Sequence, residues 1–346
     1  MSKQPALVLV KPGKTEIREI DRPTIGPEEV LLQVNKVGFC GGDLNGFRGL
    51  FELQEYPNVL GHEVGATVLE TGSQVPGQFQ PGMLVTLNPY LNCGVCLSCR
   101  KGRPNACQDN KTMGVRRPGA MTRLISVPWQ KLHSSSSLSD RELALVEPLT
   151  VGFHAVSRGR VVADEKVAVI GCGIVGMGAV AAAVHRGAQV IAIDIDDSKM
   201  RTASLAGAAH TINTTRVDLH DALMEITNGD GPDVIIEAVG HPATYRAAVD
   251  EVAYTGRVVY IGYAKKPVDY NTGTFVRKEI EILGSRNCLG EFPEVIDYLE
   301  AGKFPVDAVI SRVVSLDEAG AALADWSANP GPITKIMVNF DTLPTS

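Results

Sequence analysis

The spacing of hydrophobic residues changes along this 346-residue chain. In the first 35 residues, apolar and polar positions alternate between proline and glycine breaks, as at 6–10 and 30–34. Alternation of period two predicts antiparallel strands with one face in water. Between residues 167 and 287, short unbroken apolar runs alternate with helix-length segments, which is typical of parallel strands buried on both faces. The pattern predicts an α/β protein with a β-rich part and a doubly wound parallel sheet.

The longest apolar run, residues 167–184, carries no charged side chain. This length approaches that of a membrane-spanning helix. Glycines at 171, 173, 176 and 178 interrupt the run, however, and favour a strand, a turn and a helix instead. We expect a strand at 167–170, a helix that Gly187 ends near residue 186, and a second strand at 190–193.

The turn after the first of these strands has the pattern G-x-G-x-x-G. Its first glycine permits a tight turn, the second lets backbone N–H groups approach a pyrophosphate, and the third lets helix and strand pack closely. The positive end of the helix then faces the phosphates. Asp194 follows about 20 residues later, where a carboxylate accepts the ribose hydroxyls. The residues expected at the phosphates are Gly171, Gly173, Ile174, Val175 and Gly176.

Two later apolar runs, 234–240 and 256–262, are predicted to be further parallel strands, and 281–287 would close the sheet. Loops at the carboxyl ends of such strands border the bound ligand. We therefore expect Val239, Ile261 and Gly262 beside the nicotinamide of a dinucleotide. Helices at 292–301 and 316–326 and a strand at 335–340 are expected to return to the amino-terminal domain.

The bulk composition limits the possible partners. The chain is long enough for two domains, and 44% of its residues are hydrophobic. A net charge of −6 and a pI near 5.7 argue against binding nucleic acid or an anionic membrane. The amino terminus lacks the apolar region and cleavage site of a signal peptide, so we expect a cytoplasmic protein.

Four of the seven cysteines, Cys93, Cys96, Cys99 and Cys107, lie within one short segment. Thiolates at this spacing can surround one zinc ion tetrahedrally, and a site with four protein ligands is closed and structural. One alternative is a set of reduced surface thiols, which would be open to oxidation without a metal. A zinc module that binds nucleic acid is another, and the acidic chain argues against it.

A second set of polar residues is dispersed along the chain. Cys40 and His62 offer the sulfur and nitrogen ligands that zinc prefers. Asp43 is suited to accept the other N–H of His62 and so fix its tautomer. Glu147 precedes a proline, so we expect an extended backbone there, next to a helix start. Taken alone, the first two residues would be better explained as a buried cysteine and a core histidine whose hydrogen bonds are satisfied.

The order of these motifs resembles the zinc-containing medium-chain dehydrogenases over nearly the whole chain, from Cys40 and His62-Glu63 through the four cysteines to G-x-G-x-x-G and Asp194. Glu147 within EPLTVGFHA is similar to the sorbitol (polyol) dehydrogenase branch. The resemblance implies a GroES-like catalytic domain at 1–152 and 288–346 and a Rossmann cofactor domain at 153–287.

The resemblance also implies roles for individual residues. Cys40, His62 and Glu63 would bind a catalytic zinc, and Glu147 would bind it directly or through water, while the four clustered cysteines would hold a structural zinc. Lys199 would lie near the adenosine ribose, although an ordinary solvated lysine is the alternative. Arg286 and Asn287 would face the cleft between the domains. Pairing of edge strands between cofactor domains would give a homodimer or homotetramer.

The chain departs from the family pattern along the proton route. Gly42 replaces a serine or threonine hydroxyl, and Asn45 stands where many members carry a histidine. Neither residue relays a proton by its own ionisation. Our hypothesis is that an ordered water replaces the hydroxyl, with Glu63 or Glu147 as acceptor.

Asp194 would repel a 2′-phosphate, so we expect NAD rather than NADP. The expected cleft residues are polar and only 5% of the chain is aromatic, which favours a polyol that is oxidised to a ketose. A sugar acid comes next, because Arg286 can pair with a carboxylate, and L-threonine or a simple alcohol follows. In another functional class, the alternative is a regulatory protein that binds NAD and zinc without catalysis. Gly42 and Asn45 favour it, whereas Cys40, His62, Glu63 and Glu147 together argue against it, because a non-catalytic protein needs none of them.

Overall fold

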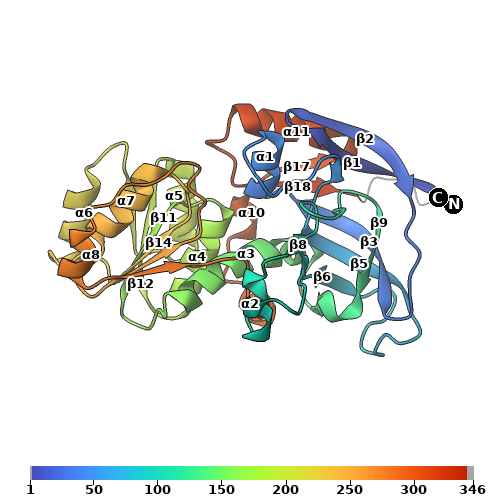
Figure 1. Cartoon of the computed structure of the whole chain (residues 1–346), viewed down its shortest axis with the longest axis horizontal. Coiled ribbons are helices and arrows are strands. Elements are labelled where there is room, and N and C mark those ends of the chain that lie inside the picture. The colour runs from blue at the N-terminus through green and yellow to red at the C-terminus, as the bar shows by residue number, and fades with distance from the viewer. Residues whose placement is uncertain (1, 341–346) are drawn as a thin grey trace. The chain divides into compact units, whose positions relative to one another are not determined.

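The computed structural model describes residues 2–340 and consists of two compact units (Figure 1). Among the described residues, unit 1 holds 2–147, Phe292–Ala301 and 310–340, and unit 2 holds Pro148–Glu291 and Gly302–Val309. The expected boundaries at 152/153 and 287/288 lie close to this division. One segment differs, because Gly302–Val309 belongs to unit 2 and not to the first domain. Its Phe304 and Val309 are buried, so apolar burial anchors it.

Unit 1 contains the antiparallel strands that the alternating pattern predicts. A three-stranded sheet has β1 (Lys3–Lys11) between β2 (Lys14–Asp21) and β4 (Asn58–Val59). A larger sheet is formed by β3 (Glu29–Gly38), β5 (Glu63–Thr71), β6 (Leu84–Leu87), β9 (Leu124–Pro128), β10 (Leu132–Ser134), β17 (Ile310–Ser315) and β18 (Lys335–Asn339). Its order is β10-β6-β5-β3-β18-β17, and β9 also pairs with β3.

The carboxy-terminal segments complete unit 1, as expected. They are α9 (Phe292–Glu300), β17, α11 (Leu316–Ala328) and β18. β18 pairs antiparallel with β3, so that Met337 lies opposite Gly38. Figure 1 shows the red α11 beside the blue β1 and β2, and its buried Leu323 and Trp326 join the same apolar core as Leu7 and Leu32.

The four-cysteine segment is a small lobe between two short strands of unit 1. β7 (Tyr90–Leu91) pairs antiparallel with β8 (Lys111–Thr112). Between them lie α2 (Leu97–Arg100) and the 3-10 turn η1 (Pro104–Ala106). Outside the lobe, a second 3-10 turn, η2 (Trp129–Lys131), precedes β10. Val95 and Leu97 are mostly exposed, so the lobe has little apolar core of its own.

The expectation of an extended backbone at Glu147 was wrong. Glu147 and Pro148 lie inside α3 (Asp140–Arg158). An internal proline costs a helix about 3 kcal/mol, because it removes one hydrogen bond and crowds the preceding turn. The fully buried Leu143, Leu145 and Leu149 offset this cost at roughly 1.5–3 kcal/mol each. Packing therefore overrides the local preference.

Unit 2 is a six-stranded parallel sheet with the order β13-β12-β11-β14-β15-β16. The strands are β11 (Lys166–Ile170), β12 (Gln189–Asp194), β13 (His210–Asn213), β14 (Val234–Glu237), β15 (Arg257–Tyr260) and β16 (Glu281–Gly284). The helices are α4 (Ile174–His185), α5 (Asp197–Leu205), α6 (Leu219–Thr227), α7 (Pro242–Glu251), α8 (Gly273–Lys278) and the short α10 (Val306–Val309). This is the Rossmann order, and it confirms the predicted fold class.

The apolar run after β11 is therefore a buried helix. α4 begins at Ile174 and ends, as predicted, before Gly187, whose φ of +81° suits glycine. Within residues 2–340, no helix is long and apolar enough to cross a membrane.

Candidate metal centres and cofactor loop

Cys40 is fixed by the start of α1 (Gly41–Phe47), a helix of unit 1. Its Sγ accepts a hydrogen bond from the Gly42 N–H at 3.3 Å, and Asp43 Oδ2 accepts from the Cys40 N–H at 2.8 Å. This is a capping box in which a sulfur replaces the usual hydroxyl. The short motif C-G-G-D thus builds its own turn and holds the sulfur in place.

Glu63 is the first residue of β5 and lies opposite Gly38 of β3, and His62 directly precedes it. A β-carbon at Gly38 would lie 2.0 Å from Glu63 Oε2, so only glycine leaves room for this carboxylate. The ligand atoms of Cys40, His62 and Glu63 all lie within 4.8 Å of one another. Residues from two distant segments are thereby brought to one point.

This cluster fits a cation. Nδ1 of His62 and Oε1 of Glu63 are buried and have no hydrogen-bond partner, and the same holds for Oδ1 of Asp43. The predicted hydrogen bond between Asp43 and His62 is thus not formed through these atoms. Buried polar atoms without partners are rare and expensive, and a metal ion with sulfur, nitrogen and oxygen ligands would satisfy a set of this kind.

The electrostatics of the cluster agree with this fit. Burial disfavours the charged imidazolium of His62, yet the negative charges of Asp43, Cys40 and Glu147 outweigh burial and hold its pKa well above its usual value. Burial raises the pKa of Asp43 and of Glu147, while the positive charge of His62 opposes both shifts. Acidic groups are crowded in this buried region, so bound positive charge would stabilise them.

Two positioning residues of this site were missed by sequence reasoning. Lys335 is fully buried in β18 and donates to Glu63 Oε2 at 2.5 Å and to the Phe39 carbonyl at 2.8 Å. Tyr90 of β7 donates its hydroxyl hydrogen to Glu147 Oε1. A lysine directly before three apolar residues of a strand was a usable signal for the first. Nothing in the pattern around Tyr90 indicated the second.

Glu147 belongs to the same buried region but not to the tight group. It is 2% exposed, and its charge acts on His62. Its carboxylate oxygens are not part of the group in which the ligand atoms of Cys40, His62 and Glu63 lie within 4.8 Å of one another. Both readings of the sequence, a direct ligand or one acting through water, remain compatible with this position.

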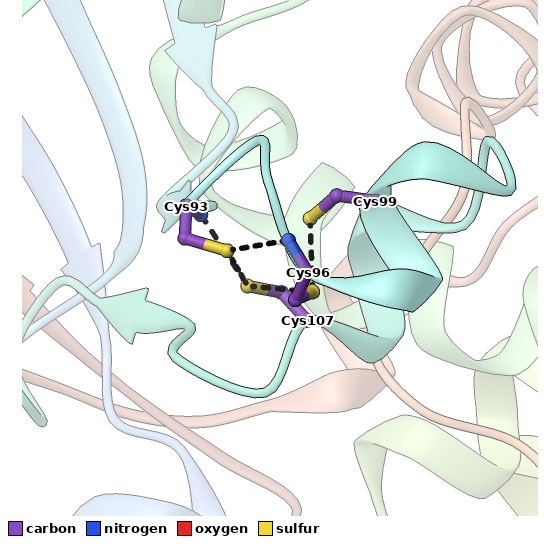
Figure 2. Close-up of side chains that lie close together, drawn as sticks. All are labelled: Cys93, Cys96, Cys99 and Cys107. Atoms are coloured by element: carbon purple, nitrogen blue, oxygen red, sulfur yellow. Dashed lines mark hydrogen bonds between the residues drawn. The ribbon is translucent and has the colours of Figure 1, made fainter.

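The four cysteines converge on one point in the lobe (Figure 2). Sγ of Cys96 lies 3.5 Å from that of Cys99 and 3.9 Å from that of Cys107, and Cys107 lies 3.5 Å from Cys93. The Ser98 hydroxyl and backbone N–H groups lower the pKa of Cys96 to about 5, whereas partial burial raises the pKa of Cys99 to about 12. Adjacent thiolates repel one another, so a cation suits this geometry as well.

The glycine-rich turn of unit 2 is built as its pattern predicts. Gly171 has φ +93°, and a β-carbon at Gly176 would lie 1.7 Å from the Gly171 carbonyl. A β-carbon at Gly173 would meet no atom within 4 Å, so this side of the turn is open to a ligand. Asp194 accepts the Cys172 N–H at 2.7 Å, which ties the end of β12 to the turn.

The remaining cofactor candidates also lie in unit 2. Gly262 and Gly240, the neighbour of Val239, approach so closely that a β-carbon at Gly262 would lie 2.2 Å from Gly240 N. Lys199 acts on Asp196 through its charge, and its N–H contributes to the cap of α5. Arg286 and Asn287 follow β16, with Asn287 at φ +52°.

Known proteins share this architecture. Residues 26–137 match the alcohol dehydrogenase GroES-like domain, and residues 175–301 match the zinc-binding dehydrogenase domain. The sequence is 32% identical to a zinc-type alcohol dehydrogenase-like protein of Haemophilus influenzae, over 97% of this chain and 98% of that protein. It is 31% identical to sorbitol dehydrogenase of Bacillus subtilis, over 96% of each. The chain belongs to the zinc-containing medium-chain dehydrogenase family.

Other relatives of this dehydrogenase include a sugar-acid dehydrogenase and two solved structures with a bound cofactor. L-galactonate-5-dehydrogenase of Escherichia coli is 28% identical over 90% of this chain and 92% of that enzyme. A zinc-binding dehydrogenase of Sinorhizobium meliloti bound to NADP has a TM-score of 0.91 and 29% identity, over 98% of this chain and 100% of that one. An Escherichia coli alcohol dehydrogenase complexed with NADH has a TM-score of 0.90 and 27% identity, with the same coverage. The protein is accordingly an NAD(P)-dependent alcohol dehydrogenase.

Proposed function

We propose that this dehydrogenase oxidises a secondary hydroxyl of a sugar alcohol to a ketose with NAD, at a zinc site formed by Cys40, His62 and Glu63. The observation that supports the proposal is the convergence of these three ligand atoms within 4.8 Å beside a second buried carboxylate, Glu147. A non-catalytic NAD-binding protein would have no need of this buried and electrostatically costly group.

A zinc ion bound here would supply Lewis acidity toward an alcohol oxygen, and the nicotinamide would accept the hydride. The side chains of this protein would bind the zinc ion and the substrate and hold them in position. Lys335 fixes one oxygen of Glu63 and partly neutralises it. Tyr90 fixes one oxygen of Glu147. The carboxylate of Glu63 is thus held by a positively charged lysine, and that of Glu147 by a neutral tyrosine. This difference supports different roles for the two carboxylates.

The substrate class rests on polarity. Glu63, Glu147 and Asn45 are polar, and they come from the part of the chain that supplies the metal site. Such groups favour a ligand with several hydroxyls over an apolar alcohol. The likeness to a sorbitol dehydrogenase supports the same choice.

A sugar acid is the second candidate. The likeness to L-galactonate-5-dehydrogenase favours it, and Arg286 is a residue that could pair with a carboxylate. L-threonine and simple alcohols come third.

The test is a kinetic panel of alditols, aldonates, L-threonine and simple alcohols, read as NADH absorbance. We expect turnover on at least one alditol, its loss after treatment with a chelator, and its return with zinc. Turnover on an aldonate with none on any alditol would overturn the substrate class. No turnover on any compound, in protein that binds NADH and zinc, would favour the non-catalytic alternative.

The proposed preference for NAD rests on Asp194, whose carboxylate would repel a 2′-phosphate. We expect kcat/KM with NAD to exceed that with NADP by about a hundredfold, and Asp194→Asn to reduce this ratio at least about tenfold, since close like charges cost several kcal/mol. The exposed Asp230 supplies a control, Asp230→Asn, which should leave the ratio unchanged. A wild-type preference for NADP would contradict the assignment.

The altered proton route gives a further prediction. A β-carbon at Gly42 would meet Cys40 Sγ at 3.7 Å and Phe51 Cε1 at 3.8 Å, which are ordinary contacts, so serine fits there. If an ordered water already replaces the hydroxyl, Gly42→Ser should change kcat by less than about threefold. A rise in kcat of more than about tenfold would show instead that the natural route is defective.

We also propose a cytoplasmic homodimer or homotetramer. Support comes from β16, an edge strand of the parallel sheet whose Ile282 is 42% exposed. Light scattering coupled to gel filtration measures the subunit number directly, and a monomer would contradict the proposal.

A further inference from the structure

A buried carboxylate lies at the carboxyl end of β14, and the metal chemistry does not use it. Glu237 is the last residue of this strand and is 0% exposed. Its Oε1 accepts three hydrogen bonds, from the Val239 N–H at 3.0 Å, the Gly240 N–H at 2.8 Å and the Thr244 hydroxyl at 2.7 Å. All three donors lie between the end of β14 and the first turn of α7. One oxygen atom therefore sets the shape of this connection.

The loop after β15 is fastened to the same point. The backbone carbonyl of Glu237 accepts from the Ile261 N–H at 2.9 Å and the Gly262 N–H at 3.2 Å. On its other side, the hydroxyl of Tyr245 in α7 donates to the Gly262 carbonyl. A β-carbon at Gly262 would lie 2.8 Å from Glu237 Oε2, so the side chain fills the space that glycine leaves. Glu237 and Tyr245 together hold both loops.

A stabilising role alone does not explain a carboxylate at this position. Oε2 of Glu237 is buried and has no hydrogen-bond partner. Burial also raises the pKa of Glu237, although its hydrogen bonds oppose the shift. A carboxylate accepts these three hydrogen bonds more strongly than a neutral amide would, although a buried charge with one free oxygen is expensive. Unfavourable groups of this kind concentrate where a function requires a fixed geometry.

The position of Glu237 in the sheet indicates that this function concerns the bound cofactor. β14 and β15 are adjacent parallel strands, and in doubly wound sheets ligands bind beyond the carboxyl ends of such strands. Val239, Ile261 and Gly262 are the residues expected beside the nicotinamide. The adenosine and phosphate groups would instead contact the Gly171–Gly176 turn and Asp194. None of the hydrogen bonds of Glu237 described above reaches that turn or Asp194.

We propose that Glu237 and Tyr245 are positioning residues that hold the Val239–Gly240 and Ile261–Gly262 loops in the geometry required by the nicotinamide half of the cofactor. This proposal rests on the NAD binding proposed above. Neither residue needs to touch the cofactor, since each acts through the backbone that it holds.

The experiment compares two ligands that differ in the nicotinamide. NADH contains it, whereas ADP-ribose lacks it and keeps the adenosine, pyrophosphate and ribose. Dissociation constants for both are measured with the zinc-loaded wild-type protein and with Glu237→Gln and Tyr245→Phe. We expect Glu237→Gln to raise the dissociation constant of NADH about tenfold or more, and Tyr245→Phe to raise it about threefold or more. The dissociation constant of ADP-ribose should change less than about twofold in both variants.

A matched control lies at the amino-terminal end of the strands of the same sheet. Glu165 precedes β11, accepts the Val162 N–H at 2.9 Å and pairs with Arg257 at the start of β15. Glu165→Gln removes a comparable charged hydrogen-bonding group and should leave both dissociation constants unchanged.

The outcomes separate the two proposals. Equal weakening of NADH and ADP-ribose, or unchanged binding of both in the Glu237 and Tyr245 variants, would overturn the positioning role. Failure of the wild-type protein to bind NADH would instead contradict the proposed function. If Glu237→Gln does not fold, Tyr245→Phe carries the same comparison, because its ring stays stacked on Tyr260 at 3.9 Å between centroids.

Discussion

His62→Ala should lower kcat/KM for the best substrate by at least about a thousandfold, because Lewis-acid stabilisation is worth several kcal/mol and each 1.36 kcal/mol is a factor of ten. The substitution removes the only nitrogen ligand of the group formed with Cys40 and Glu63. It also removes a positive charge that opposes the rise which burial causes in the pKa of Asp43 and of Glu147. Steady-state kinetics and zinc analysis of the purified variant check the prediction.

His210→Ala is the matched control, since His210 is an exposed histidine at the start of β13. It should retain wild-type kinetics and zinc content. If His62→Ala kept more than about a tenth of the wild-type kcat/KM, the metal site would not be the catalytic centre. A loss of activity together with a loss of the folded circular dichroism signal would call for the milder His62→Gln, which should show the same kinetic defect.

Cys107→Ala should remove one zinc ion per chain and destabilise the protein. Cys107 is fully buried between Cys93 and Cys96, whereas Val95 and Leu97 of the same lobe are mostly exposed. Little apolar burial is left to order the lobe without a metal. We expect the free energy of unfolding to fall by about 3 kcal/mol, which is a fraction of the roughly 10–16 kcal/mol of binding free energy at a structural zinc site. A fall of this size lowers Tm by roughly 6–12 °C.

Zinc analysis and thermal unfolding measure both effects. The control is Cys288→Ala, which removes a buried thiol that belongs to neither metal group. It should keep the full zinc content, with at most a modest fall in Tm from the lost side-chain volume. Unchanged zinc content and unchanged Tm in Cys107→Ala would contradict a structural metal site in the lobe.

Features encoded locally were predictable from the sequence. The strand at 167–170, the turn at Gly171–Gly176 and the helix ended by Gly187 each depend on residues a few positions apart. The same holds for the four cysteines, which lie within one loop. In each case the steric and bonding requirements act over one or two turns of chain, so the residue types reveal them.

Features created by distant segments were not predictable in this way. Lys335 and Glu63 are separated by 272 residues and meet only because β18 pairs with β3. The course of α3 through Pro148 reflects the burial of its neighbours and not its own sequence. Glu237 could be placed at a strand end from the sequence, but its hold on two loops depends on how those loops fold back. The candidate metal ligands were therefore easier to name than the residues that support them.

The most direct test of the account is a zinc-edge anomalous difference map from crystals of the protein grown with zinc. The account predicts one peak within bonding distance of Cys40 Sγ and a His62 ring nitrogen, about 2.0–2.3 Å away, and a second peak among the four sulfurs of Cys93, Cys96, Cys99 and Cys107. A map with no peak between Cys40 and His62 would contradict it.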